Sequence, residues 1–341
     1  MPDRRRAIWV VAEQAMGKLA PVSLEVLGQA RRLAAPSGGW EIDAVLLGNG
    51  VGRLAGDLLA GGADKVFLAE DRRLELYQND TYGTVLHKLI LRGEPEVVLF
   101  GATAMGEELA PTVAARLGTG LGAHCTDLGL GPDGLLTMGV LGFGGRMHTE
   151  MFCPARRPQM ASVKPGMFPP LERREPEGDV RSEDAAALLA DARIRLKAVR
   201  VVREEPEGLP LEEADVVVAG GWGIGGKENW NLLAELAGEL SGAVGCTRPA
   251  LDEGWTAGEH TMIGTSGKTV RPKVYLGFGI SGSPHHTVGI RDAGVIISVN
   301  SDPGAPAFEC SDFCVPADFR KILPLLLTEI RRARGVGEPV L

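Results

Sequence analysis

The 341-residue sequence has no run of about 18 apolar residues, which is the length that a transmembrane helix needs. The apolar stretch 7–12 near its start is too short for the core of a signal peptide, and Glu13 follows it directly. We therefore expect a cytoplasmic protein without membrane insertion.

Cysteine is scarce. The five cysteines are odd in number and widely spaced, except for Cys310 and Cys314, which are separated by three residues. This pattern indicates reduced thiols in the cytoplasm. One such pair without a second pair is a weak metal motif, so we predict no metal site.

An excess of positive charge is also absent. There are 36 Lys and Arg residues against 44 Asp and Glu residues, the net charge is −8, and the basic residues are scattered. A broad nucleic-acid surface is therefore not expected. An apolar fraction of 44% with 23% charged residues is typical of a soluble globular protein, and the length allows two domains.

The first half alternates expected strands with expected helices. Apolar runs predict strands at 7–12, 42–47, 65–68 and 97–100, and helical spacing predicts helices at 23–33, 52–60, 82–91 and up to 117, the last with Thr103 as its N-cap. This order predicts right-handed crossovers and a largely parallel sheet. A β-rich section follows, with strands expected at 135–140, 150–153 and 159–163.

A second α/β unit follows two connecting segments. The charged stretch 172–184 contains Pro and Gly and is interpreted as a linker or surface excursion, and 196–202 as a short strand. Beyond them we expect strands at 214–219, near Ala243 and within 273–299, and helices at 228–240 and 317–332. The simplest architecture is two α/β domains, 1–205 and 206–341, joined near 200–212.

Glycines follow the first strand of the second unit. Gly221-x-Gly223-x-x-Gly226 matches the fingerprint of a dinucleotide-binding loop between a strand and a helix. The same glycines can serve only to let a strand and a helix pack closely. No acidic residue for a ribose hydroxyl follows about 20 residues later at a strand end, so packing is favoured over an NAD site.

Small polar residues gather in two further loops. Residues 264–268 read Gly-Thr-Ser-Gly-Lys, which lacks Walker spacing; their hydroxyls can bind a ligand, or the stretch is a plain turn. In the stretch 279–286, Ser281 is the expected N-cap of a helix entered at 282–284. The N–H groups of Gly282 and Ser283 would then face an anion. His285 and His286 fall in the first turn, where a histidine can donate to a carbonyl that gains charge on reduction; a paired surface histidine is the alternative.

Polar residues also follow two other expected strands. Asn300 and Asp302 come at a strand end, where open α/β sheets place ligands, and an Asn amide can meet both edges of a heterocycle. Arg248 supplies a cation at another strand end, with a surface salt bridge as the alternative role.

Taken together, these residues resemble a known family. Their order and spacing resemble those of the C-terminal FAD-binding domain of electron transfer flavoprotein alpha subunits. The positions that carry this resemblance are Arg248 and its surrounding stretch 247–254, the loop 264–268, the stretch 279–282, His286, the run 299–302, Ala305-Pro306 and Ala317-Asp318. The similarity covers 217–330. The first half is similar through 101–103, 114–117 and 157–166, and looks most like alpha subunits from anaerobic systems.

The resemblance implies a fold and a site. It implies an N-terminal parallel-sheet domain like that of nucleotide hydrolases and a doubly wound C-terminal domain that binds FAD. Arg248 would lie over the isoalloxazine ring near N5, Ser266 would hydrogen-bond near N5, and His286 would approach the C2 carbonyl and stabilise the anionic semiquinone. Residues 281–284 would hold the pyrophosphate, and Asn300 with Asp318 the adenosine half. The full set expected to bind FAD is Thr247, Arg248, Ile263, Gly264, Thr265, Ser266, Ser281, Gly282, Ser283, Pro284, His285, His286, Asn300, Asp318 and Phe319.

Some positions depart from the family pattern. Trp222 stands where the family usually has Arg, which removes one cation expected near the pyrophosphate. Residues 265–266 are Thr-Ser where the family has Gln-Thr, 283–286 are Ser-Pro-His-His in place of Ala-Ile-Gln-His, and 312–314 are Asp-Phe-Cys in place of Asp-Tyr-Gly.

The sequence thus predicts an electron carrier without a catalytic residue. The resemblance implies non-covalent FAD, a heterodimer with a beta subunit, a dehydrogenase as electron donor, and a quinone oxidoreductase or ferredoxin-type protein as acceptor. Two alternatives stay open. One is a stand-alone flavin- or nicotinamide-dependent oxidoreductase, and the other is a non-redox nucleotide-binding regulatory module, which Trp222 makes worth testing.

Overall fold

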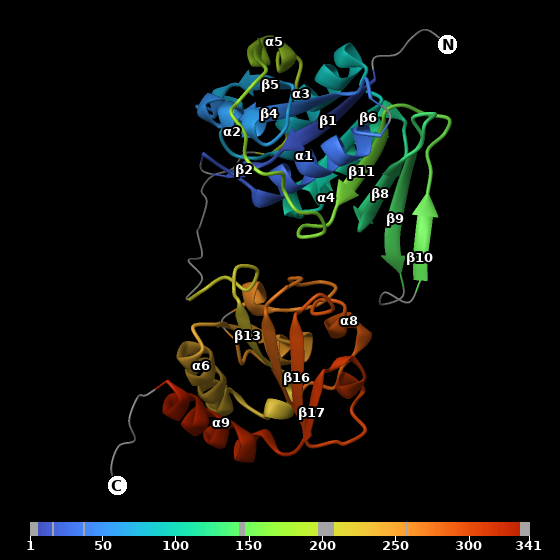
Figure 1. The fold of residues 1–341 in the computed structure, drawn as a ribbon. Coiled ribbons are helices and arrows are strands. Elements are labelled where there is room, and N and C mark those ends of the chain that lie inside the picture. Colours follow the sequence, from blue (N-terminus) through green and yellow to red (C-terminus); the bar gives the residue numbers. More distant parts are fainter. Residues whose placement is uncertain are drawn as a thin grey trace. The chain divides into compact units, whose positions relative to one another are not determined.

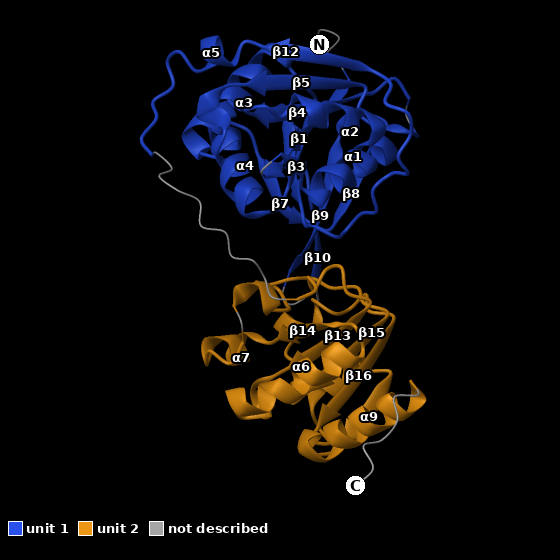
Figure 2. Ribbon diagram, turned by 90° about the vertical axis from the view of Figure 1, so that its left-hand side faces the viewer, with its two compact units in different colours: residues 1–201 blue, residues 202–341 orange. Residues whose placement is uncertain are grey.

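The computed structural model describes residues 6–15, 17–36, 38–142, 147–196, 208–256 and 258–334. The chain divides into two compact units, residues 1–201 and 202–341 (Figure 2). The domain boundary expected between 205 and 206 falls outside the described residues and stays a prediction, and so does most of the strand expected at 196–202.

The first unit is built on a parallel sheet of seven strands in the order β12-β5-β4-β1-β6-β11-β7 (Figure 1). All of its neighbouring strands run parallel, as the alternation of strands and helices predicts. The strands are β1 (Ala7–Ala12), β4 (Glu41–Gly48), β5 (Lys65–Glu70), β6 (Val97–Gly101), β7 (Leu121–Cys125), β11 (Gln159–Val163) and β12 (Asp179–Glu183).

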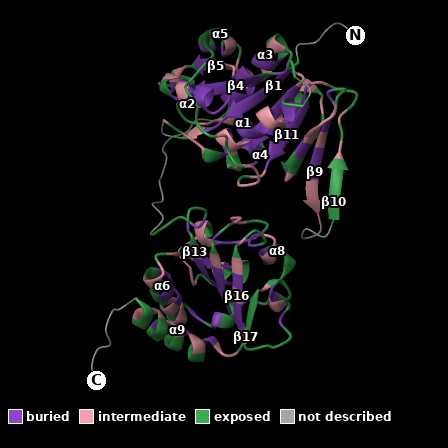
Figure 3. Ribbon diagram, in the orientation of Figure 1, coloured by how far each residue is buried: buried purple, intermediate pink, exposed green. Residues whose placement is uncertain are grey.

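Helices cover both faces of this sheet. Alternate residues of β1 enter two different cores, Ile8 and Val10 facing α1 and α2, and Trp9 and Val11 facing α3, α4 and α5. Figure 3 shows the central strands buried and the outer sides of the helices exposed. The helices are α1 (Pro21–Ala34), α2 (Ala55–Ala60), α3 (Asn79–Gly93), α4 (Ala104–Leu117) and α5 (Ala185–Leu188).

Two smaller sheets complete the first unit. The strands β8 (Asp127–Leu130), β9 (Leu136–Gly142) and β10 (Met147–Met151) form an antiparallel sheet, and β2 (Gln14–Ala15) pairs with β3 (Lys18–Leu19). The Oγ1 atom of Thr103 accepts the N–H of Gly106 at 3.1 Å, which confirms the predicted N-cap of α4.

The interpretation of 172–184 as a linker or surface excursion is wrong for its second part. The stretch contains β12, which pairs in parallel with β5 at the sheet edge. Most of β12 is exposed and Asp179, Arg181 and Glu183 alternate with the rest, so it lacks the apolar run that marks a buried strand.

The second unit has a parallel sheet of five strands in the order β14-β13-β15-β16-β17. These are β13 (Val216–Gly220), β14 (Ala243–Cys246), β15 (Val274–Phe278), β16 (Val295–Asn300) and β17 (Phe313–Pro316). The edge strand β17 is largely exposed, and the hydrophobic pattern does not predict it.

Helices α6 (Trp230–Glu239) and α9 (Phe319–Ala333) pack together over one face of this sheet, around Leu233, Phe278 and Leu323 (Figure 1). The other face is covered by side chains from connecting segments, including Leu211, Val270 and Ile290. The short helices α7 (Arg248–Asp252) and α8 (Pro284–Thr287) follow β14 and β15.

Candidate functional site

The site begins where the strand order of the second sheet reverses. The chain goes from β13 to β14 on one side and then to β15 on the other, so the carboxyl ends of β13 and β15 form a switch point. Open α/β sheets bind ligands outside such a point.

The glycine loop after β13 is used for close packing at this point. The N–H of Gly221 donates to the carbonyl of Phe278 at 2.9 Å, and that of Gly223 donates to Gly279 at 3.0 Å. A Cβ on Gly221 would lie 2.4 Å from the carbonyl oxygen of Gly279. These N–H groups therefore do not face a ligand, which favours the packing interpretation over a dinucleotide fingerprint.

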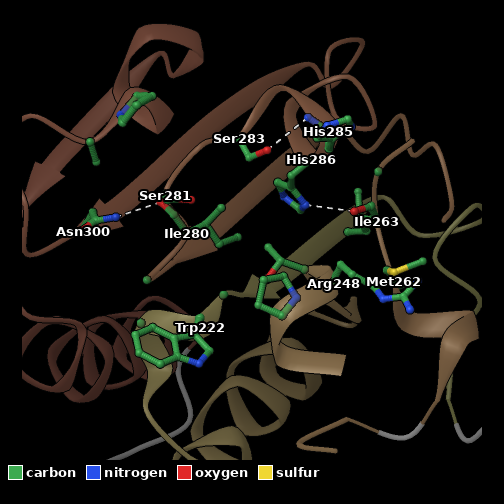
Figure 4. A pocket seen from close by; sticks show the side chains of 18 of the residues that line it. Trp222, Arg248, Met262, Ile263, Ile280, Ser281, Ser283, His285, His286 and Asn300 are labelled. Atoms are coloured by element: carbon green, nitrogen blue, oxygen red, sulfur yellow. Dashed lines mark hydrogen bonds between the residues drawn. The ribbon is translucent and has the colours of Figure 1, made fainter. Parts of the chain in front are cut away.

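A cavity of about 800 Å³ opens beside the switch point (Figure 4). Most of the expected FAD-binding residues line it, together with Pro249, Met262 and Ile280, which the sequence did not single out. The predicted residues on its wall are Thr247, Arg248, Ile263, Gly264, Thr265, Ser266, Ser281, Ser283, His285, His286 and Asn300. Met262 lies next to the predicted residue Ile263 and Ile280 lies within the predicted stretch 279–286, so their position beside polar motif residues was the available signal for them.

His286 is held by two hydrogen bonds to the protein. Its Nδ1 lies 3.0 Å from the carbonyl oxygen of Ile263, and its Nε2 lies 2.7 Å from the hydroxyl of Tyr275. A carbonyl can only accept, so Nδ1 carries the proton and Nε2 accepts from the phenol. Burial lowers the pKa of His286 to about 4, so the ring is neutral at pH 7.

Arg248 lies on the cavity wall with its guanidinium exposed. Its Nε donates to Asp252 Oδ1 at 2.7 Å, one turn along α7, and the Arg248 side chain is 59% exposed. The expected cation and the alternative surface salt bridge are therefore both present. An exposed pair of this kind stabilises a helix only weakly, so Arg248 is free to exchange Asp252 for a ligand.

Helix α8 begins two residues later than predicted. Its N-cap is Ser283, whose Oγ accepts the N–H of His285 at 3.3 Å, and the expected cap Ser281 is wrong. Gly282 has φ +88° between them, and a Cβ there would meet the backbone N of Ala307 at 2.0 Å. That left-handed residue separates Ser281 from the helix, because only glycine adopts the conformation without strain.

The loop 264–268 is a turn that packs on α8. The N–H of Gly267 donates to Gly264, and the N–H of Thr265 donates to the carbonyl of His285 at 2.7 Å. The amine of Lys268 pairs with Glu212 at 2.5 Å. The turn interpretation and the ligand interpretation are compatible, because Thr265 and Ser266 also line the cavity.

Asn300 braces the cavity wall. Its Nδ2 donates to the carbonyl of Ile280 at 2.8 Å (Figure 4). Its Oδ1 accepts the N–H of Asp302 at 2.9 Å. Both polar ends of the amide thus already have a protein partner.

Four of the expected residues do not line the cavity. Gly282 lies in the turn that precedes α8, and Pro284 is the first residue of α8. Asp318 caps α9 by accepting the N–H of Arg320 at 2.9 Å, and Phe319 is buried against Leu323 in the core. The structure therefore brings together the residues expected around the flavin ring but gives Asp318 and Phe319 structural contacts.

Trp222 is an exposed large hydrophobic side chain on the cavity wall. It lies between Gly221 and Gly223 and is 64% exposed. Among the residues that the structure describes, no group of three or more His, Cys, Asp or Glu side chains is arranged to hold a metal ion, and no helix has the length and hydropathy to cross a membrane.

The sequence matches two family models in succession. Residues 8–188 match the electron transfer flavoprotein domain, and residues 210–291 match the electron transfer flavoprotein FAD-binding domain.

Similar proteins span nearly the whole chain. The electron transfer flavoprotein subunit alpha of Thermoanaerobacterium thermosaccharolyticum is 40% identical over 328 residues, covering 96% of this chain and 98% of that protein. That of Megasphaera elsdenii is 40% identical, with 97% and 98% coverage. A protein named acryloyl-CoA reductase electron transfer subunit beta from Anaerotignum propionicum is 35% identical, with 97% coverage of both. The chain belongs to the electron transfer flavoprotein alpha-subunit family, and its second unit carries that family's FAD-binding domain.

Proposed function

We propose that this chain binds one FAD non-covalently in the cavity beside β13 and β15, and carries electrons as one subunit of a heterodimer with a beta subunit. A dehydrogenase supplies the electrons, and a quinone oxidoreductase or a ferredoxin-type protein accepts them. The observation that carries the proposal is the cavity itself, which gathers Arg248, Ser266 and Asn300 from three separate segments of the chain.

The cavity suits a dinucleotide in size and chemistry. Its volume of about 800 Å³ lies in the range of cofactor sites, about 300–1,000 Å³. Thr265, Ser266 and Ser283 bring hydroxyl groups to its lining, and in Figure 4 Asn300 and His286 lie on opposite sides of Ile280. Hydroxyl and backbone donors beside apolar walls match a cofactor with an apolar ring and a charged linker.

FAD supplies the redox chemistry when bound, and the protein sets its potential. The Arg248 guanidinium lies on the cavity wall, where a positive charge favours the reduced and more negative form of the ring. The neutral His286 contributes no such charge. Its predicted hydrogen bond to the flavin C2 carbonyl requires that Tyr275 release Nε2 and that Nε2 gain a proton, because a carbonyl can only accept and Nε2 carries no proton in this arrangement.

Among the described residues that line the cavity, no hydroxyl nucleophile is paired with a histidine base. None of its serine or threonine side chains is hydrogen-bonded to a histidine ring; Thr265 Oγ1 instead donates to the backbone carbonyl of His285. This argues against covalent catalysis by a serine or threonine of the cavity, and turnover of a substrate by the isolated chain remains the test that separates an electron carrier from a stand-alone oxidoreductase.

The experiment is to co-express the chain with a beta subunit, purify the complex, and measure the flavin spectrum and the FAD content per complex. A yellow heterodimer, bleached anaerobically by a dehydrogenase with its substrate and reoxidised by an acceptor, is the expected result. A colourless heterodimer that takes up no added FAD contradicts the proposal. Binding of AMP or ADP without FAD points to a regulatory module, and substrate turnover by the isolated chain points to an enzyme.

A further inference from the structure

A second cavity, of about 580 Å³, lies in the first unit. Its walls come from α3, from Arg116 in the last turn of α4, and from residues 191–195, which follow α5 and run along α3 from Lys88 to Asp80. The electron-carrying function uses none of these residues.

The two carboxylates in this cavity are both neutralised by a cation. Asp80 accepts from Arg195 at 2.6 Å through Nη2 and at 2.8 Å through the backbone N–H, and these bonds hold its pKa below the usual range. Asp191 is paired with Lys88, which lowers the pKa of Asp191 in the same way. Neither carboxylate is available for another cation.

Two arginines in the same cavity form no ion pair with a carboxylate among the residues that the structure describes, although the charge of Arg116 also helps to lower the pKa of Asp80. The Nη1 of Arg116 donates to the Thr84 hydroxyl, at 3.2 Å, and Arg193 has no described partner. The surplus is thus two positive charges in a protein whose net charge is −8. These positive charges also act on the side chain of His87. Burial lowers the pKa of His87 most, and the charges of Arg116 and Lys88 lower it further.

We propose that this cavity binds the phosphate group of a small phosphorylated molecule. Arg116 and Arg193 come from separate segments of the chain, and each guanidinium has the charge and the planar N–H donors that pair with a phosphate dianion. Leu91, which is 57% exposed, also lines the cavity and offers an apolar contact for the organic part of such a ligand. The proposal does not depend on FAD binding.

The test uses the full chain and calorimetric titration with inorganic phosphate, AMP and ribose 5-phosphate, at a fixed ionic strength of about 0.15 M. The double substitution Arg116→Gln and Arg193→Gln is expected to weaken binding at least tenfold. Arg72→Gln is the matched control, because Arg72 is exposed in the same unit and does not line the cavity; it is expected to change binding less than twofold. A thermal melt checks that each variant is folded.

A second readout follows His87 by proton NMR, with His87→Gln used to assign its resonance. A bound phosphate offsets the nearby cations, so saturation is expected to raise the pKa of His87 in the native sequence and not in the double variant. Stronger binding of the phosphomonoesters than of inorganic phosphate identifies a metabolite site. Equal binding by the double variant, an effect that chloride reproduces, or binding of poly-glutamate without binding of phosphate each overturns the proposal.

Discussion

The hydroxyl of Tyr275 donates to Nε2 of His286 across 2.7 Å, in a part of the second unit where both side chains are at least 95% buried. With Nδ1 committed to the carbonyl of Ile263, this bond fixes one tautomer of the ring. Tyr275 therefore governs whether His286 can offer a proton to the cavity that it lines.

Tyr275→Phe is expected to raise the pKa of His286, because the phenol stabilises the neutral ring by donating to its lone pair. Proton NMR of the His286 C2 proton, assigned with His286→Gln, measures the change. The variant is also expected to lose about 1–3 kcal/mol of stability, since Nε2 stays buried without a donor. Tyr82→Phe, which removes a buried hydroxyl in the first unit, should leave the His286 pKa unchanged.

The second unit is expected to lose stability in acid. The folded-state pKa of His286 is about 4 against 6.5 for an ordinary histidine, so the unfolded state binds the proton first as pH falls. Stability should therefore drop between pH 6.5 and pH 4, by about 3 kcal/mol at most. Urea unfolding across this range should show the drop for the native sequence and for His285→Gln, the exposed neighbour. An equal drop in His286→Gln would assign it to other groups.

Glu13 is expected to make the first unit less stable as the pH rises, which is the opposite of the effect expected for His286. Burial raises the pKa of its carboxyl from 4.5 to about 7, an effect reduced by the Thr103 hydroxyl, which donates to Oε2 at 2.5 Å. The folded state then holds the proton more tightly, so stability should fall by about 3 kcal/mol as pH rises from 4.5 to 7. Glu13→Gln mimics the protonated acid, and its denaturation midpoint should lack this slope.

Arg248→Gln is expected to lower the midpoint potential of bound FAD, because it removes a positive charge from the cavity wall. Spectroelectrochemical titration of the heterodimer measures this. Arg271→Gln is the matched control, since Arg271 is also an exposed, ion-paired arginine of the second unit but does not line the cavity. If both variants shift the potential equally, the effect of Arg248 is not local.

Gly282→Ala is expected to destabilise the second unit by more than about 2 kcal/mol and to impair FAD binding. Its φ of +88° and the backbone of Ala307 leave no room for a methyl group. Gly238→Ala provides the contrast, because Gly238 lies in α6 and a methyl group there would have nothing within 4 Å. Alanine at that position should stabilise the unit by about 0.5–1 kcal/mol. Thermal melts of both variants measure these opposite effects.

Continuous apolar runs located the buried strands well, because a strand covered on both faces has a distinctive composition. The predicted 7–12 coincides with β1, and 42–47 lies within β4. Exposed edge strands carry no such run, which is why β12 and β17 were missed.

The grouping of residues around one cavity could be predicted from the sequence, whereas their FAD-binding roles stay a prediction and their hydrogen bonds could not be foreseen. The motifs predicted that Arg248, Ser266, His286 and Asn300 share one site, and all four line the cavity. The hydrogen bonds of His286 depend on Tyr275 and Ile263, which are 11 and 23 residues away, and local sequence carries no signal for such pairings. The choice of Ser283 over Ser281 as N-cap likewise depended on a contact between Gly282 and Ala307.

The two hydrogen bonds from Gly221 and Gly223 to the end of β15 also bear on how a ligand enters. These bonds connect the carboxyl ends of β13 and β15 without the help of a ligand, so the backbone beneath the cavity is preorganised. Binding then orders few backbone groups and loses little conformational entropy. A cofactor held in this way is selected by its fit to a rigid floor, with adjustment left to side chains such as Trp222 and Arg248.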